Sequence, residues 1–402
     1  MTIDRQRRDL KGPSRAVHAG ERPEPRDFIP VTTPIYPTSS FVYRDLERMD
    51  EALGGGDGVY AYTRYGNPTL EAMEISIAGL EEQEAALGFG SGMAAVNAAI
   101  LTNVQSGDRI LASRDIYGAT TSLLSNVFMT LGVPTTFVDI LDLEDVAAKM
   151  ESLKPRVVLC ETISNPLLRV TAVDKLRDLC REHGAILIVD NTFATPLLFP
   201  TGKHGVDISV HSSTKYLGGH GDVTAGVAAT SHERRTEMNE INKAIGSLLG
   251  PFEAWLVLRG IKTMALRVEK QCRNAAIIAD WLQHHPKLQW VYYPGLPNHK
   301  SHETAKRLLP DDQFGAMVSF ELKDGTQEKA WEFMRTLQMV VPATTLGDVH
   351  SLVLYPPMSS HRALSPEQRQ EVGISDGLIR LSVGIEDPTD IVADLERALD
   401  RI

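Results

Sequence analysis

The segment VHSSTKYLGGH, residues 210–220, contains a lysine whose position could make it a nucleophile. The residues VDISV before it alternate like a strand that ends at His211, so we expect Lys215 on a turn just beyond that strand's carboxyl end. Open α/β sheets bind their ligands at this edge. A lysine on a turn is most often a solvated surface charge, so its meaning depends on the rest of the chain.

A second segment, LGFGSGMAAVNAAI at residues 87–100, leads from an apolar strand through glycines into an apolar helix. Free backbone amides at a helix start bind phosphate, and small residues let the anion approach. A dinucleotide fingerprint needs a third glycine where this chain has Met93, which weakens a dehydrogenase interpretation. A tight turn without a ligand is the alternative.

A third segment, ILIVDNTFATP, ends a buried strand with Asp190. A carboxylate at a strand end either caps the following loop or serves a ligand. A buried aspartate is stable as an anion mainly when it faces a cation, and a protonated pyridine ring would be one.

A fourth segment, YTRYGNPT at residues 62–69, places Tyr62 and Arg64 on one side of an extended stretch before a turn. The planar guanidinium suits phosphate or carboxylate, although an unattached surface strand would have the same pattern.

Together, these segments offer a phosphate-binding helix start, a strand-end acid, and a strand-end lysine flanked by hydroxyl groups. Pyridoxal 5′-phosphate (PLP) needs this combination: an amine for covalent attachment, an acid for the ring nitrogen, and donors for the phosphate. No other common cofactor needs all three.

The elements that must position these residues alternate between strand and helix from about residue 70. Amphipathic helices are predicted at 142–153 and 173–184, with apolar strands at 157–162 and 185–192. This alternation predicts an α/β fold with a mostly parallel sheet covered on both faces.

Beyond residue 262 the pattern changes to that of a smaller α+β domain. It ends in a helix that Asp387 caps and Pro388 begins. Before residue 63 the chain is rich in Pro, Thr and Tyr without a clear helical period, so this arm is expected to lie on another domain or subunit.

Composition narrows the class further. The 402 residues include 41 basic and 52 acidic ones, a formal net charge of −11 that disfavours nucleic-acid or anionic-membrane partners. The three cysteines are too far apart for a zinc ribbon or a disulfide framework, so no metal site is expected. No apolar stretch is long enough for a membrane span, and we expect a soluble, cytoplasmic protein.

With these residues in place, the chain resembles the Cys/Met-metabolism (trans-sulfuration) family of PLP enzymes from about Val17 to its end. The motifs YTRYGNPT, GSGMAA, DIYGATT, ETISNP, VDNTFATP, HSSTKYLGGHGDVTAG and IRLSVGIED occur in the family's order. The resemblance implies a type I aminotransferase-like fold and a homotetramer with shared active sites. It divides the chain into an arm at 1–63 that contacts a neighbouring subunit, a PLP-binding domain at 64–261, and a C-terminal domain at 262–402.

The resemblance also implies a role for each matching residue. Lys215 would bond to the cofactor and carry protons, Asp190 would pair with the pyridine nitrogen, and Tyr117 would stack on the ring and act as acid or base. The phosphate would be held by Ser212, Thr214 and the backbone of Gly92 and Met93, with Tyr62 and Arg64 reaching it from the neighbouring chain. Arg380 would take the substrate's α-carboxylate, and Asn165 would lie near the cofactor hydroxyl and the substrate.

The family supports two reactions. We expect γ-elimination on a sulfur amino acid (cystathionine, homocysteine or methionine), with γ-replacement on an O-acylhomoserine as the alternative. Specificity is expected from Thr345, where serine is common, and from His350, where cystathionine-handling members usually carry a glutamate. His350 could instead be an exposed loop residue.

Two other classes of protein are disfavoured. A catalytically idle binding module would not need Lys215, Asp190, Tyr117 and Arg380, and a dehydrogenase would leave Lys215 unexplained.

Overall fold

The computed structural model describes residues 30–402 except 57, 311, 360–361 and 363–364. The part of the arm before residue 30, including the start of the family resemblance, lies outside the described residues. Residues Ile35–Ile402 cluster as one unit, which carries both sheets of the protein. Within the part of the chain that the structure describes, no helix combines the length and the apolar character needed to cross a membrane.

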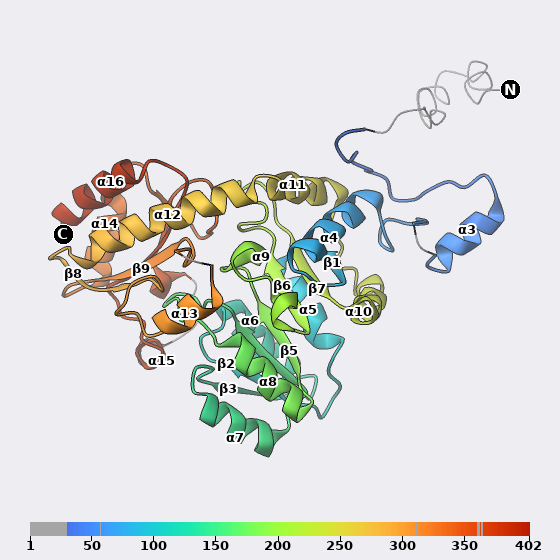
Figure 1. Ribbon diagram of the computed structural model, residues 1–402, viewed down its shortest axis with the longest axis horizontal. Helices are drawn as coiled ribbons and strands as arrows, with labels where there is room; N and C mark the ends of the chain where they lie inside the picture. The colour runs from blue at the N-terminus through green and yellow to red at the C-terminus, as the bar shows by residue number, and fades with distance from the viewer. Residues whose placement is uncertain (1–29, 57, 311, 360–361, 363–364) are drawn as a thin grey trace. The chain divides into compact units, whose positions relative to one another are not determined.

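A seven-stranded sheet forms the larger part of this unit (Figure 1). Four of its neighbouring pairs are parallel, whereas β7 runs antiparallel to both of its neighbours. The predicted, mostly parallel sheet is therefore confirmed. In spatial order its strands are β1 (Ala85–Phe89), β7 (Gly226–Thr230), β6 (Ile208–Ser212), β5 (Ile186–Asp190), β4 (Val157–Glu161), β2 (Ile110–Ser113) and β3 (Thr135–Val138).

The strands of this sheet are continuous apolar runs because both faces are buried. In β4, Val158 and Cys160 pack in one core cluster, while Val157 and Leu159 pack in a second cluster on the opposite face. The first cluster includes side chains of α4 (Pro68–Leu80), α7 (Leu143–Leu153), α8 (Val173–His183) and α11 (Pro251–Ile261). The second includes side chains of α5 (Gly92–Leu101) and α10 (His232–Ile245).

A five-stranded sheet forms the C-terminal part, as the α+β pattern predicted. Its order is β10 (Val341–Pro342), β11 (Leu352–Leu354), β12 (Leu378–Ser382), β9 (Met317–Leu322) and β8 (Leu288–Tyr292). Helices α14 (Gln327–Thr336) and α16 (Pro388–Asp400) share its core. Helix α16 begins as predicted, since the Asp387 side chain accepts the Thr389 N–H and Pro388 occupies the first position.

Helix α12 (Met264–Gln283) belongs to both cores. Its first half contributes Met264, Val268 and Cys272 to the core of the large sheet, and its second half contributes Ala275 and Ile278 to that of the small sheet. Figure 1 shows it extending from α11 to the region of α14 and α16. The domain boundaries at 63 and 261 stay predictions.

One helix was not expected. Helix α3 (Leu46–Leu53) lies in the arm, where no helical period was evident. Its start is set by Asp45, whose side chain accepts the Arg48 N–H at 2.7 Å. Its apolar residues Leu46, Met49 and Leu53 are exposed, so this helix is held by capping and not by a packed face.

Glu81 is a buried carboxyl group that contacts the ends of two neighbouring strands, β5 and β6. It accepts hydrogen bonds from the backbone and hydroxyl of Thr201, from the Asn191 amide at 2.9 Å, and it pairs with His211 of β6. Burial opposes ionisation of Glu81, but His211 and the hydrogen bonds from Thr201 and Asn191 outweigh it and lower the pKa of the carboxyl. The ends of β5 and β6 are thereby tied to the end of α4.

We expect Glu81→Gln to destabilise the protein by about 3 kcal/mol, because an amide N–H₂ would then oppose groups that donate to the carboxylate. Thermal unfolding of the purified protein measures the effect as a lower midpoint. Glu82→Gln, at the exposed neighbouring position, is the control and should leave the midpoint nearly unchanged. Equal midpoints for the two variants would contradict the anchoring role.

Candidate active site

A cavity of about 460 Å³ opens at the carboxyl ends of β4, β5 and β6. Its size suits a cofactor together with a small substrate. It brings together most of the predicted site residues, namely Gly92, Met93, Tyr117, Asn165, Asp190, Ser212, Thr214, Lys215 and Arg380.

Lys215 lies on the turn after β6, as predicted, and its side chain is directed to the segment that contains Thr345. Its backbone N–H bonds to the Ser212 carbonyl at 3.1 Å, and its Nζ donates to the Thr345 hydroxyl at 2.7 Å. Burial, and after it the charge of Arg380, lower the pKa of Lys215 to about 8. The amine is therefore neutral over a pH range in which a surface lysine is protonated.

Two carboxyl groups lie next to each other at the ends of β4 and β5. Glu161 and Asp190 are register partners in the parallel ladder. Asp190 accepts the Thr192 N–H at 3.0 Å, yet burial raises its pKa. Burial, followed by the charge of Asp190, raises the pKa of Glu161 well above its usual value. Asp190 thus has the environment of an acid that needs a cation to stay ionised.

The start of α5 contributes backbone donors to the cavity. Ser91 caps the helix by accepting the Ala94 N–H at 3.1 Å, and the first N–H groups of a helix lack intrahelical partners. A Cβ at Gly92 would lie 2.8 Å from the Cβ of Ser212, so only glycine allows this close approach. The helix start and the hydroxyls of Ser212 and Thr214 line one end of the same cavity.

Arg380 enters from β12 of the small sheet. It is buried, and its Nη1 donates to the Asn165 side-chain oxygen at 2.8 Å. Its Nε is buried without a hydrogen-bond partner among the described residues. Burial lowers the pKa of Arg380 to about 10, which leaves it a cation at neutral pH. The guanidinium therefore retains capacity to bind an anion.

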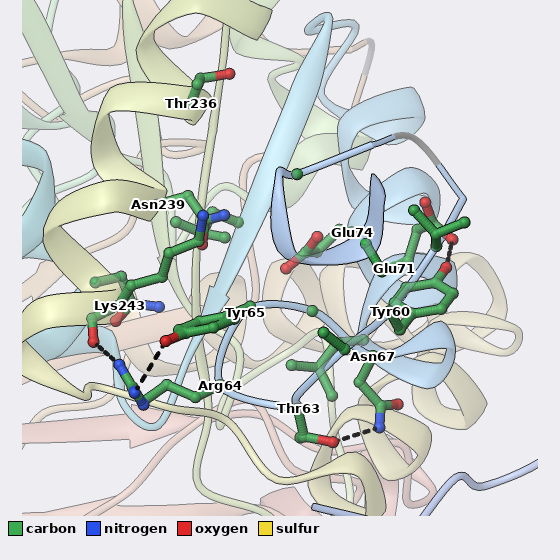
Figure 2. Close-up of a pocket in the computed structure, with 18 of the residues that line it drawn as sticks. Tyr60, Thr63, Arg64, Tyr65, Asn67, Glu71, Glu74, Thr236, Asn239 and Lys243 are labelled. Carbon is green, nitrogen blue, oxygen red and sulfur yellow. Dashed lines mark hydrogen bonds between the residues drawn. The ribbon is translucent and has the colours of Figure 1, made fainter. Parts of the chain in front are cut away.

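Four predicted residues are not on this lining. Thr345 contacts Lys215 through its hydroxyl, and the other three lie elsewhere. Arg64 lines a separate cavity of about 450 Å³, where it donates to the Lys243 carbonyl and stacks over the Tyr65 ring with its Cζ 4.8 Å from the centroid (Figure 2). Tyr62 is 42% exposed near it. The His350 side chain is 66% exposed, and its Nδ1 lies 3.1 Å from an Asp348 oxygen. Within one chain, none of the three lines the Lys215 cavity.

Thr192 and Glu161 are among the cavity-lining residues that sequence reasoning missed. Thr192 accepts the Ser212 N–H at 2.9 Å and so joins the loops after β5 and β6. Glu161 ends β4 as Asp190 ends β5, and the same strand-end signal could have identified it.

The chemistry of these groups fits PLP. A buried amine of lowered pKa, a buried carboxyl, a helix start that excludes any side chain at Gly92, and hydroxyl groups face a single cavity. These are the donor types that the aldehyde, the pyridine nitrogen and the phosphate of this cofactor require.

Comparison with known proteins decides the family. The sequence model of the Cys/Met metabolism PLP-dependent enzymes matches residues 13–400. The chain belongs to this family. It is an enzyme that depends on PLP, which confirms the predicted cofactor and the predicted fold class.

Similar members of the family carry different names. The chain is 41% identical to an L-methionine gamma-lyase of Fusobacterium nucleatum over 390 residues, which is 96% of this chain and 97% of the relative. It is 42% identical to a cystathionine beta-lyase of Lactococcus lactis over 372 residues, 92% and 94% of the two chains. The crystal structure of cystathionine gamma synthase from Xanthomonas oryzae pv. oryzae superimposes with a TM-score of 0.86 at 35% identity, covering 92% of this chain and 93% of that one.

The lowered pKa of Lys215 can be measured directly. In cofactor-free protein, acylation of Lys215 by acetic anhydride should reach half its maximal rate near pH 8, because only the neutral amine reacts and the protonated form predominates below that pH. Surface lysines should have midpoints near ~10.4. Peptide mass spectrometry follows each lysine separately.

Arg380→Gln should move the Lys215 midpoint to higher pH, since it removes the second cause of the lowered pKa. A Lys215 profile that coincides with those of surface lysines would show that the amine is not buried in solution.

Proposed function

We propose that this enzyme catalyses γ-elimination on a sulfur amino acid and releases a thiol, ammonia and 2-oxobutanoate. One observation carries the proposal: an amine of lowered pKa, Lys215, shares a cavity with the buried acid Asp190 and the buried cation Arg380. The methionine gamma-lyase relative supports the carbon–sulfur lyase class.

The proposed roles follow from these positions. Bound PLP would supply an electron sink for negative charge at the substrate Cα. Lys215 would hold the cofactor and then move a proton at Cα, and Asp190 would keep the pyridine nitrogen protonated. Tyr117 would stack on the ring and exchange a proton beside the leaving group.

The other side chains would bind and orient. Ser212, Thr214 and the amides of Gly92 and Met93 would hold the phosphate. Arg380 would bind the α-carboxylate, with Asn165 fixing the guanidinium through the 2.8 Å contact. Thr345 would orient the Lys215 amine, which donates to its hydroxyl in this structure.

The leaving-group side favours an uncharged thiol or thioether. Among the residues described as lining the cavity, the only acids are Glu161 and Asp190, and both lie at strand ends in the large sheet. The position where a glutamate would bind a distal ammonium group holds His350, which points to solvent. Methionine and homocysteine are therefore better candidates than cystathionine.

Two other reactions are candidates. The cystathionine gamma synthase structure supports γ-replacement on O-acetyl- or O-succinylhomoserine, and the cystathionine beta-lyase relative supports β-elimination.

A cytoplasmic location is part of the proposal. It is supported by three buried cysteines without disulfides, as is usual in a reducing compartment.

The reaction can be assigned from its products. The purified enzyme should release ammonia and 2-oxobutanoate from L-methionine or L-homocysteine without added thiol. Pyruvate from L-cystathionine would instead show β-elimination, and consumption of an O-acylhomoserine only with cysteine or sulfide would show γ-replacement. Lys215→Ala is the control and should reduce every rate by several orders of magnitude. Either of the two other product patterns would replace the proposal.

We also propose that the active site is completed by a second copy of the chain, in a homo-oligomer that is expected to be a tetramer. Between residues 36 and 65, large apolar side chains are exposed at Tyr36, Val42, Leu46, Met49, Leu53, Tyr62 and Tyr65. Exposed apolar groups at this density are typical of protein interfaces. Tyr62 and Arg64, which lie outside their own chain's Lys215 cavity, would then reach the phosphate in the neighbouring one.

Mixed oligomers test this arrangement. Arg64→Ala and Lys215→Ala should each be nearly inactive, but a mixture refolded or exchanged together should regain up to about a quarter of the activity, because some sites would have both residues intact. A mixture of Asp190→Ala with Lys215→Ala is the matched control and should regain nothing, since both residues belong to one chain's cavity. Equal recovery in both mixtures, or none in the first, would refute sharing through Arg64.

A further inference from the structure

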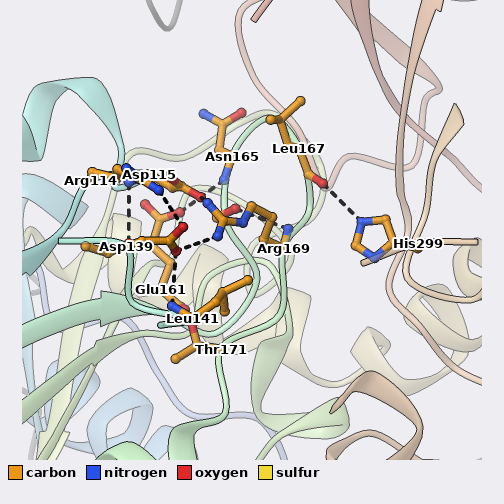
Figure 3. Close-up of polar contacts among 12 residues, drawn as sticks. Arg114, Asp115, Asp139, Leu141, Glu161, Asn165, Leu167, Arg169, Thr171 and His299 are labelled. Carbon is orange, nitrogen blue, oxygen red and sulfur yellow. Dashed lines mark hydrogen bonds and ion pairs between the residues drawn. The ribbon is translucent and has the colours of Figure 1, made fainter. Parts of the chain in front are cut away.

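Glu161 uses both oxygens of its carboxyl group to join two backbone segments of the site. Its Oε1 accepts the Tyr117 N–H at 2.7 Å. Its Oε2 accepts the N–H of Asn165, which Figure 3 shows beside it, at 3.2 Å. The residue is only 7% exposed and lines the active-site cavity. One side chain therefore sets the distance between the loop after β2 and the loop after β4.

Asn165 also connects Glu161 to Arg380, the buried cation of the site. The backbone of Asn165 is held by Glu161, and its side-chain oxygen accepts Arg380 Nη1 at 2.8 Å. Arg380 lies on β12 of the other sheet, and Asn165 joins it to the large domain, while its Nη2 donates to the Thr345 carbonyl at 3.4 Å. The series Glu161, Asn165, Arg380 is continuous through two hydrogen bonds.

The loop that contains Asn165 has other anchors, which Figure 3 shows in part. Arg169 donates to Asp115 at 2.6 Å and to Asp139, and the Leu167 carbonyl lies 3.2 Å from Nε2 of His299. The Ser319 hydroxyl donates to the Pro166 carbonyl at 2.6 Å. These contacts do not involve the Glu161 side chain, so the loop can keep its fold when that side chain changes.

We propose that Glu161 is a positioning residue that aligns the carboxylate-binding pair Asn165 and Arg380 with Tyr117. The inference rests on the proposed role of Arg380 as the site for the substrate's α-carboxylate. Among the described residues, the Glu161 side chain makes no hydrogen bond to Lys215 or Arg380; it acts through the backbone of Tyr117 and Asn165.

Glutamine is an informative replacement because it has nearly the same shape as glutamate. Its single carbonyl oxygen can accept only one of the two N–H groups, and its N–H₂ would face the other. Glu161→Gln therefore keeps the volume of the side chain and breaks one of the two connections.

The test compares two ligands of the holoenzyme, glycine and methylamine, by the change in visible absorption and circular dichroism of the bound cofactor. Both are primary amines, and only glycine has a carboxylate. We expect Glu161→Gln to weaken glycine binding about 10-fold to 100-fold, as misplacement of a binding group does, and methylamine binding less than about 3-fold. Glycine has no γ-substituent, so the result does not depend on which reaction the enzyme catalyses.

A double-mutant cycle and a structural control complete the test. Because Glu161 acts through Asn165, Glu161→Gln should add little to the loss of glycine affinity already caused by Asn165→Ala. Thr171→Val removes the 2.7 Å hydrogen bond from the Thr171 hydroxyl to the Glu161 carbonyl without touching the Glu161 carboxylate. It should leave the glycine-to-methylamine ratio unchanged.

Three outcomes would overturn the proposal: equal weakening of both ligands, additive losses in the cycle, or the same change in ratio in Thr171→Val. If Glu161→Gln does not yield a folded holoenzyme, Glu161→Asp, which is too short to reach both N–H groups, is measured in the same way. Loss of the cofactor in both variants would assign Glu161 to cofactor retention and also refute the proposal.

Discussion

Two carboxyl groups buried side by side govern the structure of this site. Glu161 and Asp190 end adjacent parallel strands as register partners, and neither can be ionised there without compensation. The structure gives them different surroundings. Glu161 is surrounded by backbone N–H groups, which orient two loops, whereas Asp190 accepts one N–H and remains open to the cavity, where a cationic ring nitrogen can pair with it. The same strand geometry thus yields one group that holds the backbone and one suited to the cofactor.

The same low-polarity environment sets the pKa values of the two cationic groups of the site, Lys215 and Arg380. Burial lowers the pKa of both Lys215 and Arg380, and the charge of Arg380 lowers the pKa of Lys215 further. Lys215 has the lower pKa of the two, about 8 against about 10. It therefore becomes a neutral nucleophile near pH 8, while Arg380 stays charged. Arg380 lies on the small sheet and Lys215 follows a strand of the large one. The effect of Arg380 on the pKa of Lys215 therefore requires that the two sheets pack next to each other. Helix α12 packs in both cores and so connects the two sheets.

Much of this arrangement could be predicted from the sequence because the signals are local. Continuous apolar runs indicated β4 and β5. Position at a strand end singled out Asp190 and Lys215, and their predicted roles came from the combination of motifs and from the family resemblance. Glu161 has the same strand-end position, which could have identified it, but its contacts could not be predicted, because its partners are backbone N–H groups of Tyr117 and Asn165 and backbone groups leave no signature in the sequence. Helix α3 was missed for a related reason: its start depends on one capping residue, Asp45, and its apolar face is not covered within the described chain. The exposure of His350 depends on the path of a loop, which spacing does not determine.

The cavity can discriminate strongly at the end that binds the α-carboxylate and only weakly at the end that binds the leaving group. The α-carboxylate end of the cavity can discriminate strongly, because a buried guanidinium without its anion is costly. Apart from Glu161 and Asp190, no described residue on the lining has an acidic side chain to pair with a positive charge on the leaving group, and Leu346 and Leu354 are apolar. An apolar wall distinguishes substrates by only about 1–3 kcal/mol for each methylene group. Relatives that share about two fifths of this sequence accordingly carry the names of different lyases. Small changes in the lining, not in the charged groups that bind cofactor and carboxylate, are what would separate such activities.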